Sequence, residues 1–191
     1  MEVDDAMEVD TVAAGADVAD EEATALRARD DRAAFAILYV RHREAVFRYL
    51  RARCASDDDA LELTAVTFER ALAAMPRYSS RGGGVVAWLL RIARNAVIDQ
   101  ARRRRPLLPG WNGPERASDD LTPEEAAIGA EQRRALRREL AELPQLQRDA
   151  IALRYGTGLT ARQISLVINK SEEATQKLLT RAIARLKEAL S

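Results

Sequence analysis

The chain has 191 residues, and its 30 Lys and Arg balance its 30 Asp and Glu, so the formal net charge is zero. Its single cysteine, Cys54, and single histidine, His42, exclude a disulfide framework and a Cys/His zinc site, and we expect no metal and no cofactor. The uncharged apolar runs are shorter than the roughly 20 residues that span a bilayer, and the N-terminus is acidic where a signal peptide is basic. We therefore expect a cytoplasmic protein without membrane insertion.

Composition favours helix almost throughout. Alanine, leucine and arginine dominate, whereas the chain has only 9 glycines and 6 prolines, and its β-branched runs are short. No hydrolase or transferase constellation is visible, so we expect neither enzymatic activity nor a small-molecule substrate. The sequence predicts an all-α protein with two small helical domains joined by a flexible linker.

Charge is distributed unevenly along the chain. Residues 1–25 carry a net charge of −9, residues 26–105 carry +8, residues 106–130 carry −4 and residues 131–191 carry +5. This layout indicates two modules that meet a polyanion and two segments that do not.

The acidic segment at the N-terminus covers residues 1–25 and begins with the repeat MEVDDAMEVD. It has few large apolar side chains, so we predict that it is disordered. Two interpretations are open: a solvating tail, whose true start could be Met7, or a DNA mimic that folds back on the basic module. The second predicts that deletion of residues 1–22 raises DNA affinity at low salt.

The first predicted domain covers residues 26–105 and opens with two helices. Helical spacing of Phe35, Leu38, Tyr39, Val46 and Leu50 predicts a helix over residues 32–54. A second helix is predicted over 57–75, with an acidic N-terminus that suits the helix dipole. Its predicted buried side is formed by Thr64, Phe68, Ala71, Leu72 and Met75.

A loop and a basic helix complete this domain. Pro76 and three glycines, residues 82–84, break the helix and leave a loop over residues 76–86. Over residues 87–106, a period of 100° per residue places an apolar arc opposite a basic arc, and the stretch ends in four arginines. The apolar arc, predicted to face the core, comprises Trp88, Leu89, Ile92, Ala93, Ala96 and Val97. Arginine and asparagine side chains at such spacing suit phosphates and base edges, although a solvated basic face is the alternative. The basic arc comprises Arg91, Arg94, Asn95, Ile98 and Arg102.

A linker follows at residues 106–122, which hold three prolines and two glycines. Thr122, Pro123 and Glu125 then predict the start of a helix and of a second domain over residues 123–191. In this domain Thr160 and Gln163 form a predicted capping box, Asn169 suits a tight turn, and Ser171 can cap the last helix.

These two helices and their turn are typical of a helix-turn-helix, with a protein-binding helical bundle as the alternative. On the last helix the predicted buried stripe runs from Thr175 to Leu190. The outward side chains that would enter a major groove are Glu173, Gln176, Lys177, Thr180 and Arg181.

Three stretches give the chain its resemblance to a known family: LTAVTFERAL, AWLLRIARNAVIDQARRRR, and the segment from LPQLQRDAIALRYG to the final helix. With them the chain resembles a sigma factor of the sigma-seventy family, in the extracytoplasmic-function (ECF) group. The resemblance implies a transcription initiation factor that binds bacterial core RNA polymerase and promoter DNA, both as duplex and as melted non-template strand. An anti-sigma factor is an implied further partner.

The resemblance also assigns roles to residues. The first domain would bind the polymerase clamp through Glu62, Leu63, Val66, Glu69 and Arg70. It would bind the minus-ten element through Tyr78, Ser79, Ser80, Arg81, Arg91, Arg94, Asn95, Ile98, Arg102 and Arg103, with the loop holding a flipped base. The second domain would read the minus-thirty-five element through Arg162, Lys170, Ser171, Glu173, Gln176, Lys177, Thr180 and Arg181.

Some positions depart from the family pattern, and two other functions remain open. Ala65 and Val66 stand where the family usually has Gln and Glu, and Leu178 replaces a polar residue of the recognition helix. One alternative is a polymerase-independent helix-turn-helix regulator that binds duplex DNA. The other is a sigma mimic that binds an anti-sigma factor and needs neither Asn95 nor the arginines.

Overall fold

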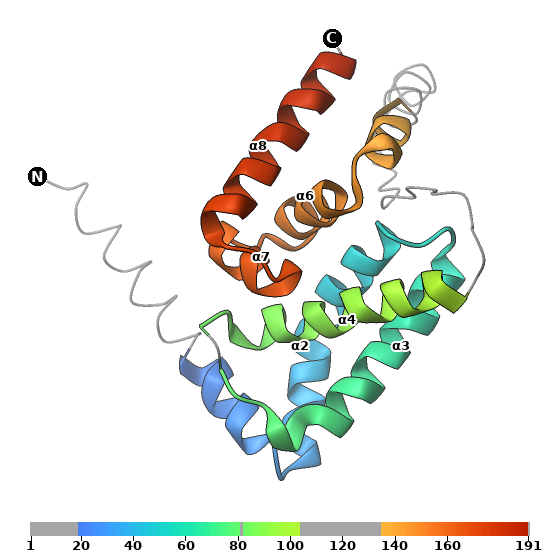
Figure 1. Ribbon diagram of the computed structural model, residues 1–191. Helices are drawn as coiled ribbons and strands as arrows, with labels where there is room; N and C mark the ends of the chain where they lie inside the picture. Colours follow the sequence, from blue (N-terminus) through green and yellow to red (C-terminus); the bar gives the residue numbers. More distant parts are fainter. Residues whose placement is uncertain (1–18, 81, 104–134, 191) are drawn as a thin grey trace, which may run out of the picture.

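A computed structural model describes residues 19–80, 82–103 and 135–190 of the chain. All regular structure within these residues is helical, which confirms the predicted all-α fold class (Figure 1). None of the described helices is both long enough and apolar enough to cross a membrane. The predicted linker, the helix start at Thr122, and Arg81 lie outside the described residues.

The first unit is built from α2 (Arg32–Arg51), α3 (Asp57–Ala74), the short 3₁₀ turn η1 (Met75–Arg77) and α4 (Gly84–Arg103). The side chain of Asp31 caps α2 by accepting from the Ala33 amide, and the Ser56 hydroxyl caps α3 by accepting from the Asp59 amide. Pro76 lies two residues after the end of α3, within η1, where the chain tightens and leaves the helix axis. The predicted helices thus lie within three residues of those observed, α4 beginning three residues early at Gly84.

The prediction of a disordered N-terminal segment is wrong for residues 19–25, since residues 19–27 are helical and pack on the first unit. Thr24 and Ala25 are buried. The acidic side chains find partners there: Asp20 pairs with Arg41 at 2.8 Å, and Glu21 lies 3.5 Å from His42. Its alanines and glutamates favour helix, but a helix this short is marginal in isolation, and these tertiary contacts stabilise it. Residues 1–18 lie outside the description.

The second unit contains a helical segment at residues 135–142, then α6 (Gln145–Thr157), α7 (Ala161–Ile168) and α8 (Glu172–Ala189). Helix α6 ends on Gly158 with φ of 74°, a left-handed conformation that glycine adopts without strain. Between α7 and α8 the chain turns at Asn169. Its φ of 55° is the left-handed conformation that asparagine tolerates well, as predicted for this turn.

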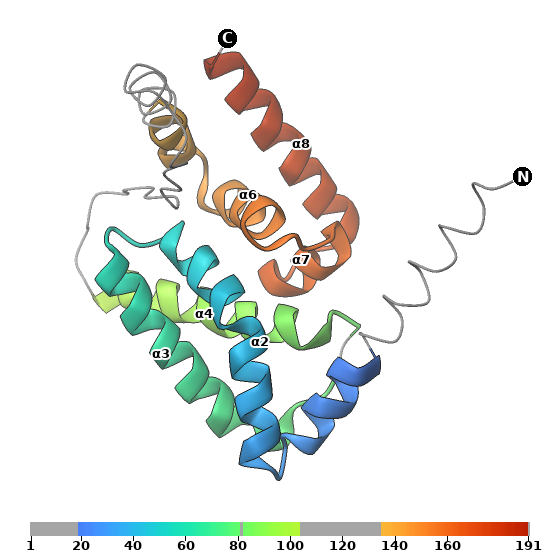
Figure 2. The ribbon, with the colours of Figure 1, turned by 180° about the vertical axis from the view of Figure 1, so that it is seen from behind.

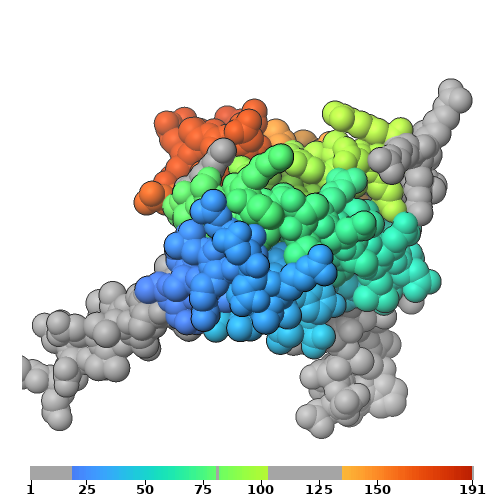
Figure 3. All heavy atoms as spheres, turned by 90° about the horizontal axis from the view of Figure 1, so that it is seen from below, coloured from blue at the N-terminus to red at the C-terminus, as the bar shows by residue number. Residues whose placement is uncertain are grey.

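The two units pack against each other, with α4 between them. Helix α6 contacts α2, and α7 lies on α4 (Figures 1 and 2). From below, the second unit, coloured orange to red, lies directly against the green start of α4 (Figure 3). One apolar cluster therefore extends from Leu50 and Leu89 in the first unit to Leu153 and Ile164 in the second.

Packing changes the predicted buried faces in two ways. Leu90 lies outside the predicted apolar arc of α4 yet is fully buried, because α4 is covered by α2 and α3 on one side and by α7 on another. Conversely, Leu72 and Leu190 were expected on buried sides and are 39% and 46% exposed, and Tyr39, part of the apolar spacing of the first helix, is 40% exposed. Tyr39 keeps one contact with the core, an edge-on approach to Phe68 at 4.8 Å between ring centroids.

Candidate nucleic-acid interface

Helix α4 presents part of its basic face to solvent. Asn95 and Arg102 are exposed, whereas Arg91 and Ile98 are half-buried. Arg94 points away from solvent, because its Nε lies 2.9 Å from the Asp149 carboxylate of α6. The predicted DNA-facing arc is therefore divided: one end is accessible, and Arg94 is occupied by the second unit. Nothing is described for the side chain of Arg103.

The loop before α4 holds its aromatic ring inside the protein. Tyr78 is 3% exposed, its hydroxyl donates to Glu22 over 3.3 Å, and its ring meets Trp88 edge-on at 5.2 Å. Burial, reinforced by the Glu22 carboxylate, raises the pKa of Tyr78 to about 12, so the hydroxyl stays protonated as a donor. Ser79 and Ser80, in contrast, are exposed.

A small cavity of about 30 Å³ adjoins this loop. That volume accommodates about one water molecule. Its wall combines loop residues with Trp88 and Arg91 of α4, and Leu166 of α7 completes it. Leu166 of the helix-turn-helix therefore borders the place where the sequence predicts a captured base.

The helix-turn-helix is held by the caps that the sequence predicts. The Thr160 hydroxyl accepts from the Gln163 amide, and the Gln163 side chain accepts from the Thr160 amide, which is a complete capping box. The Ser171 hydroxyl accepts from the Ala174 amide and caps α8. These hydrogen bonds satisfy helix amides that would otherwise lack partners at the starts of α7 and α8.

Helix α8 shows solvent a polar face that suits a major groove. Within it, Lys177 pairs with Glu173 one turn earlier, which partly neutralises its charge. Lys170 and Ser171 precede the helix and are exposed, as is Arg162 on α7. All five side chains of α8 that were predicted to read DNA are exposed: Glu173, Gln176, Lys177, Thr180 and Arg181.

The residues assigned to the polymerase clamp lie on α3 with different exposures. Glu62 and Glu69 are exposed, and Val66 and Arg70 are half-buried. Leu63 is 4% exposed and belongs to the core, so its side chain is not available at this surface. Arg70 pairs with Asp99 of α4 at 2.9 Å, a contact that fixes α3 against α4.

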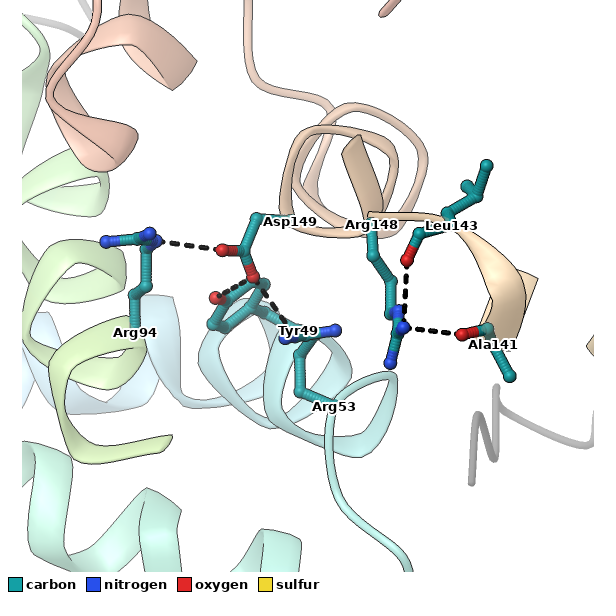
Figure 4. Close-up of polar contacts among 7 residues, drawn as sticks. All are labelled: Tyr49, Arg53, Arg94, Ala141, Leu143, Arg148 and Asp149. Atoms are coloured by element: carbon teal, nitrogen blue, oxygen red, sulfur yellow. Dashed lines mark hydrogen bonds and ion pairs between the residues drawn. The ribbon is translucent and has the colours of Figure 1, made fainter. Parts of the chain in front are cut away.

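A buried carboxylate between the units is the feature that sequence reasoning missed. Asp149 is 1% exposed and lies 3.0 Å from Arg53 Nε and 2.9 Å from Arg94 Nε, while Tyr49 donates to it over 3.1 Å (Figure 4). Burial and the neighbouring carboxylate raise the pKa of Tyr49 well above its usual value. The sequence signal was an acidic residue on the apolar side of α6, three residues after Leu146.

The neighbouring Arg148 has a different, local role. It donates to the main-chain carbonyls of Ala141 and Leu143, which end the preceding helical segment (Figure 4). Burial lowers the pKa of Arg148 from its usual value, with Arg53 acting in the same direction. Arg148 therefore links α6 to the segment before it by hydrogen bonds, whereas Asp149 contacts the first unit.

Comparison with protein families matches both units. The model for Sigma-70 region 2 matches residues 38–106, and the model for Sigma-70, region 4 matches residues 140–188. The first match covers α2 to α4, and the second covers α6 to α8.

Known proteins give the same result. The chain is 30% identical over 159 residues to the ECF RNA polymerase sigma factor BldN of Streptomyces coelicolor, a match that spans 82% of this chain and 60% of BldN. It is 34% identical over 158 residues to SigD of Mycobacterium tuberculosis, spanning 78% of this chain and 73% of SigD. The sigma factor RpoE of Bartonella quintana, solved in complex with the anti-sigma factor NepR, has the same fold, with a TM-score of 0.65, 20% identity and coverage of 82% of this chain and 96% of that one. The chain therefore belongs to the ECF sigma factors of the sigma-70 family, which are transcription initiation factors and not enzymes.

Proposed function

We propose that this protein binds bacterial core RNA polymerase and directs it to promoters, with residues 26–105 opening the minus-ten element and residues 123–191 reading the minus-thirty-five element. The observation that carries the proposal is that one chain has two different surfaces, each suited to DNA. One is the exposed end of the basic α4 face at Asn95 and Arg102, and the other is the polar face of the capped helix α8. Neither surface alone distinguishes a sigma factor from a simple DNA-binding protein.

A third surface supports binding to the polymerase. Helices α2 and α3 pack together and leave five large apolar side chains exposed, whose exposed fractions range from 39% to 62%. Exposed apolar side chains beside charged ones are typical of protein interaction surfaces. These side chains are Ile37, Tyr39 and Val40 on α2 and Leu61 and Leu72 on α3, the helix that also carries Glu62 and Glu69.

On the DNA, the resemblance and the side chains suggest separate roles for the two units. Arg91, Asn95 and Arg102 of α4 would follow the melted non-template strand, since arginine binds phosphate and asparagine binds base edges. Helix α8 would enter the major groove of duplex DNA. Such a protein works in the cytoplasm.

An anti-sigma factor is the partner we propose for control. RpoE of Bartonella quintana was solved with such a partner. The apolar surface of α2 and α3 would attract it, because the surface that binds polymerase is the one an inhibitor must cover. Affinity purification from the source bacterium, with Leu61→Arg as the control bait, tests this. Capture of the same protein by both baits would count against the surface we assign.

Run-off transcription with core polymerase on genomic fragments of the source bacterium tests the function. We expect discrete start sites with the wild type, and loss of product with Asn95→Ala and Arg91→Ala but not with Arg43→Ala, which removes an exposed arginine from α2. Leu61→Arg should lose core binding in gel filtration. If the wild type gives no transcript but binds duplex DNA, the chain is a polymerase-independent regulator. If it binds neither, the sigma-mimic interpretation gains support.

A further inference from the structure

The second unit covers part of the face of α4 that the proposed function assigns to DNA. Helix α7 lies on α4, and α6 lies against α2 (Figures 1 and 2). Two separate sets of contacts hold this closed arrangement, one polar and one at the loop before α4. Each removes a group from the surface that would meet the melted strand.

The polar set is the cluster around Asp149. Its carboxylate is enclosed by Arg53 and Arg94 of the first unit, whose side chains are 6% and 16% exposed, and by the Tyr49 hydroxyl (Figure 4). A buried carboxylate needs such partners, and Asp149 obtains all of them from the other unit. When the units separate, the carboxylate and both guanidinium groups regain water. The cluster is therefore strong enough to orient the closed state, yet the groups are not stranded when it opens.

The second set of contacts blocks the loop. Gln163 of α7 donates to the carbonyl of Gly83 over 3.3 Å, and Leu166 walls the cavity beside Tyr78 and Trp88. A side chain at Gly83 would lie 2.6 Å from a Leu166 methyl, which shows how closely α7 approaches the loop. With room for about one water, the cavity is too small for a nucleobase while α7 is in place.

We propose that Asp149 is an interdomain latch that holds the helix-turn-helix over α4 and keeps the free protein from binding single-stranded DNA. The role of this latch in transcription rests on the proposed function. Release of the latch frees Arg94 for the strand and opens the cavity at Leu166 together. Binding of polymerase to either unit favours the open state only insofar as polymerase binds the separated units more tightly.

An engineered disulfide tests whether closure blocks DNA. A Cβ at Gly83 lies 3.9 Å from the Leu166 Cβ, which is within the range that disulfides adopt. In Gly83→Cys/Leu166→Cys we expect mild oxidation to close the bond in the free chain. The oxidised form should bind a mixed-sequence single-stranded oligonucleotide about tenfold more weakly than the reduced form, because only the open fraction binds. The two single variants control for oxidation of Cys54. Equal binding by the oxidised and reduced forms overturns the proposal.

A second comparison tests the role of Asp149 itself. Asp149→Asn keeps the size of the side chain and removes its charge. In the double-cysteine chain it should slow disulfide formation about tenfold, and in the native chain it should tighten oligonucleotide binding. Arg53→Met should act in the same direction without touching the residues assigned to DNA, and circular dichroism checks that both variants fold. Unchanged crosslinking rates in both variants overturn the latch.

The two proposals can fail separately. Crosslinking needs neither polymerase nor a promoter. If the wild type gives no transcript while the double-cysteine chain crosslinks in an Asp149-dependent way, the proposed function is removed and the latch stays in place. If the wild type gives transcripts but Asp149→Asn does not change crosslinking, the proposed function stands and the latch is overturned.

Discussion

At the scale of single residues, the charges on the DNA-facing surfaces are partly neutralised within the protein. Arg94 is paired with Asp149, and Lys177 is paired with Glu173. The two pairs differ in environment, since Asp149 is 1% exposed whereas both members of the α8 pair lie in solvent. An exposed pair between residues four apart contributes little to stability, so its effect should be on the field that DNA meets.

This difference predicts a gain of DNA affinity from Glu173→Gln. Removing the acid releases Lys177 for a phosphate and removes repulsion, so binding to a mixed-sequence duplex should tighten and its salt dependence should steepen by about one counterion. Fluorescence anisotropy at salt concentrations from about 50 to about 200 mM, where such effects are large, measures the affinity and its salt dependence. Glu188→Gln, at the exposed far end of α8, is the matched control. If both variants gain equally, the effect is one of net charge and not of position.

At the scale of elements, the sequence predicts most helices well because their signals are local. The apolar period, the caps Ser56, Thr160 and Ser171, and the left-handed Asn169 all lie within a few residues of the helix they define. The helix at residues 19–27 was missed although its alanines and glutamates favour helix, because a helix this short is marginal alone and the contacts that stabilise it are not local. Its acidic side chains are stabilised by Arg41, His42 and Tyr78, which are distant in sequence.

The capping box gives a prediction for the helix-turn-helix. Thr160→Ala removes the hydroxyl that accepts from the Gln163 amide and should lower the free energy of unfolding of the second unit by about 1 kcal/mol. Urea unfolding followed by circular dichroism measures the loss. Thr180→Ala, exposed in the middle of α8, should change stability by less than about 0.5 kcal/mol. Similar losses in the two variants would show that the cap is not what stabilises α7.

The buried His42 should make stability depend on pH. Burial lowers the pKa of His42 below its ordinary value of 6.5, with Arg41 acting in the same direction and Glu21 opposing it. Between the lowered folded pKa and 6.5 the unfolded chain binds more protons, so the stabilisation from neutral His42 is present above 6.5 and is lost as pH falls through the folded pKa. Urea unfolding on both sides of this interval should show that loss in the wild type. His42→Gln, which removes the chain's only histidine, should reduce it, and equal slopes would contradict the assignment.

At the scale of the whole molecule, the arrangement of the two units could not be predicted from the sequence. The periodicity of α4 places Arg94 with Arg91 on an outward face, and it cannot show that α6 brings a carboxylate there. The same holds for Leu166 of α7, which approaches Gly83 of the first unit. An acidic residue on the apolar side of α6 indicates that a buried partner exists, but only the packed structure identifies it. Family resemblance assigns DNA roles to single residues, and the closed arrangement shows which of them are occupied.

Charge segregation along the whole chain leads to the last prediction. Residues 2–18 hold six of the nine acids in the N-terminal segment, and deleting them keeps the docked helix that carries the other three. If these acids compete with DNA for the basic first unit, the deletion should tighten binding to single-stranded DNA at low salt. The gain should vanish near about 1 M salt, where the Debye length falls to about 3 Å. A chain of full length with the six acids changed to their amides should match the deletion, because the argument depends on charge and not on length. Anisotropy titrations over a salt series decide it: unchanged affinity at low salt leaves the segment as a solvating tail, and a gain from the deletion alone points to a steric effect.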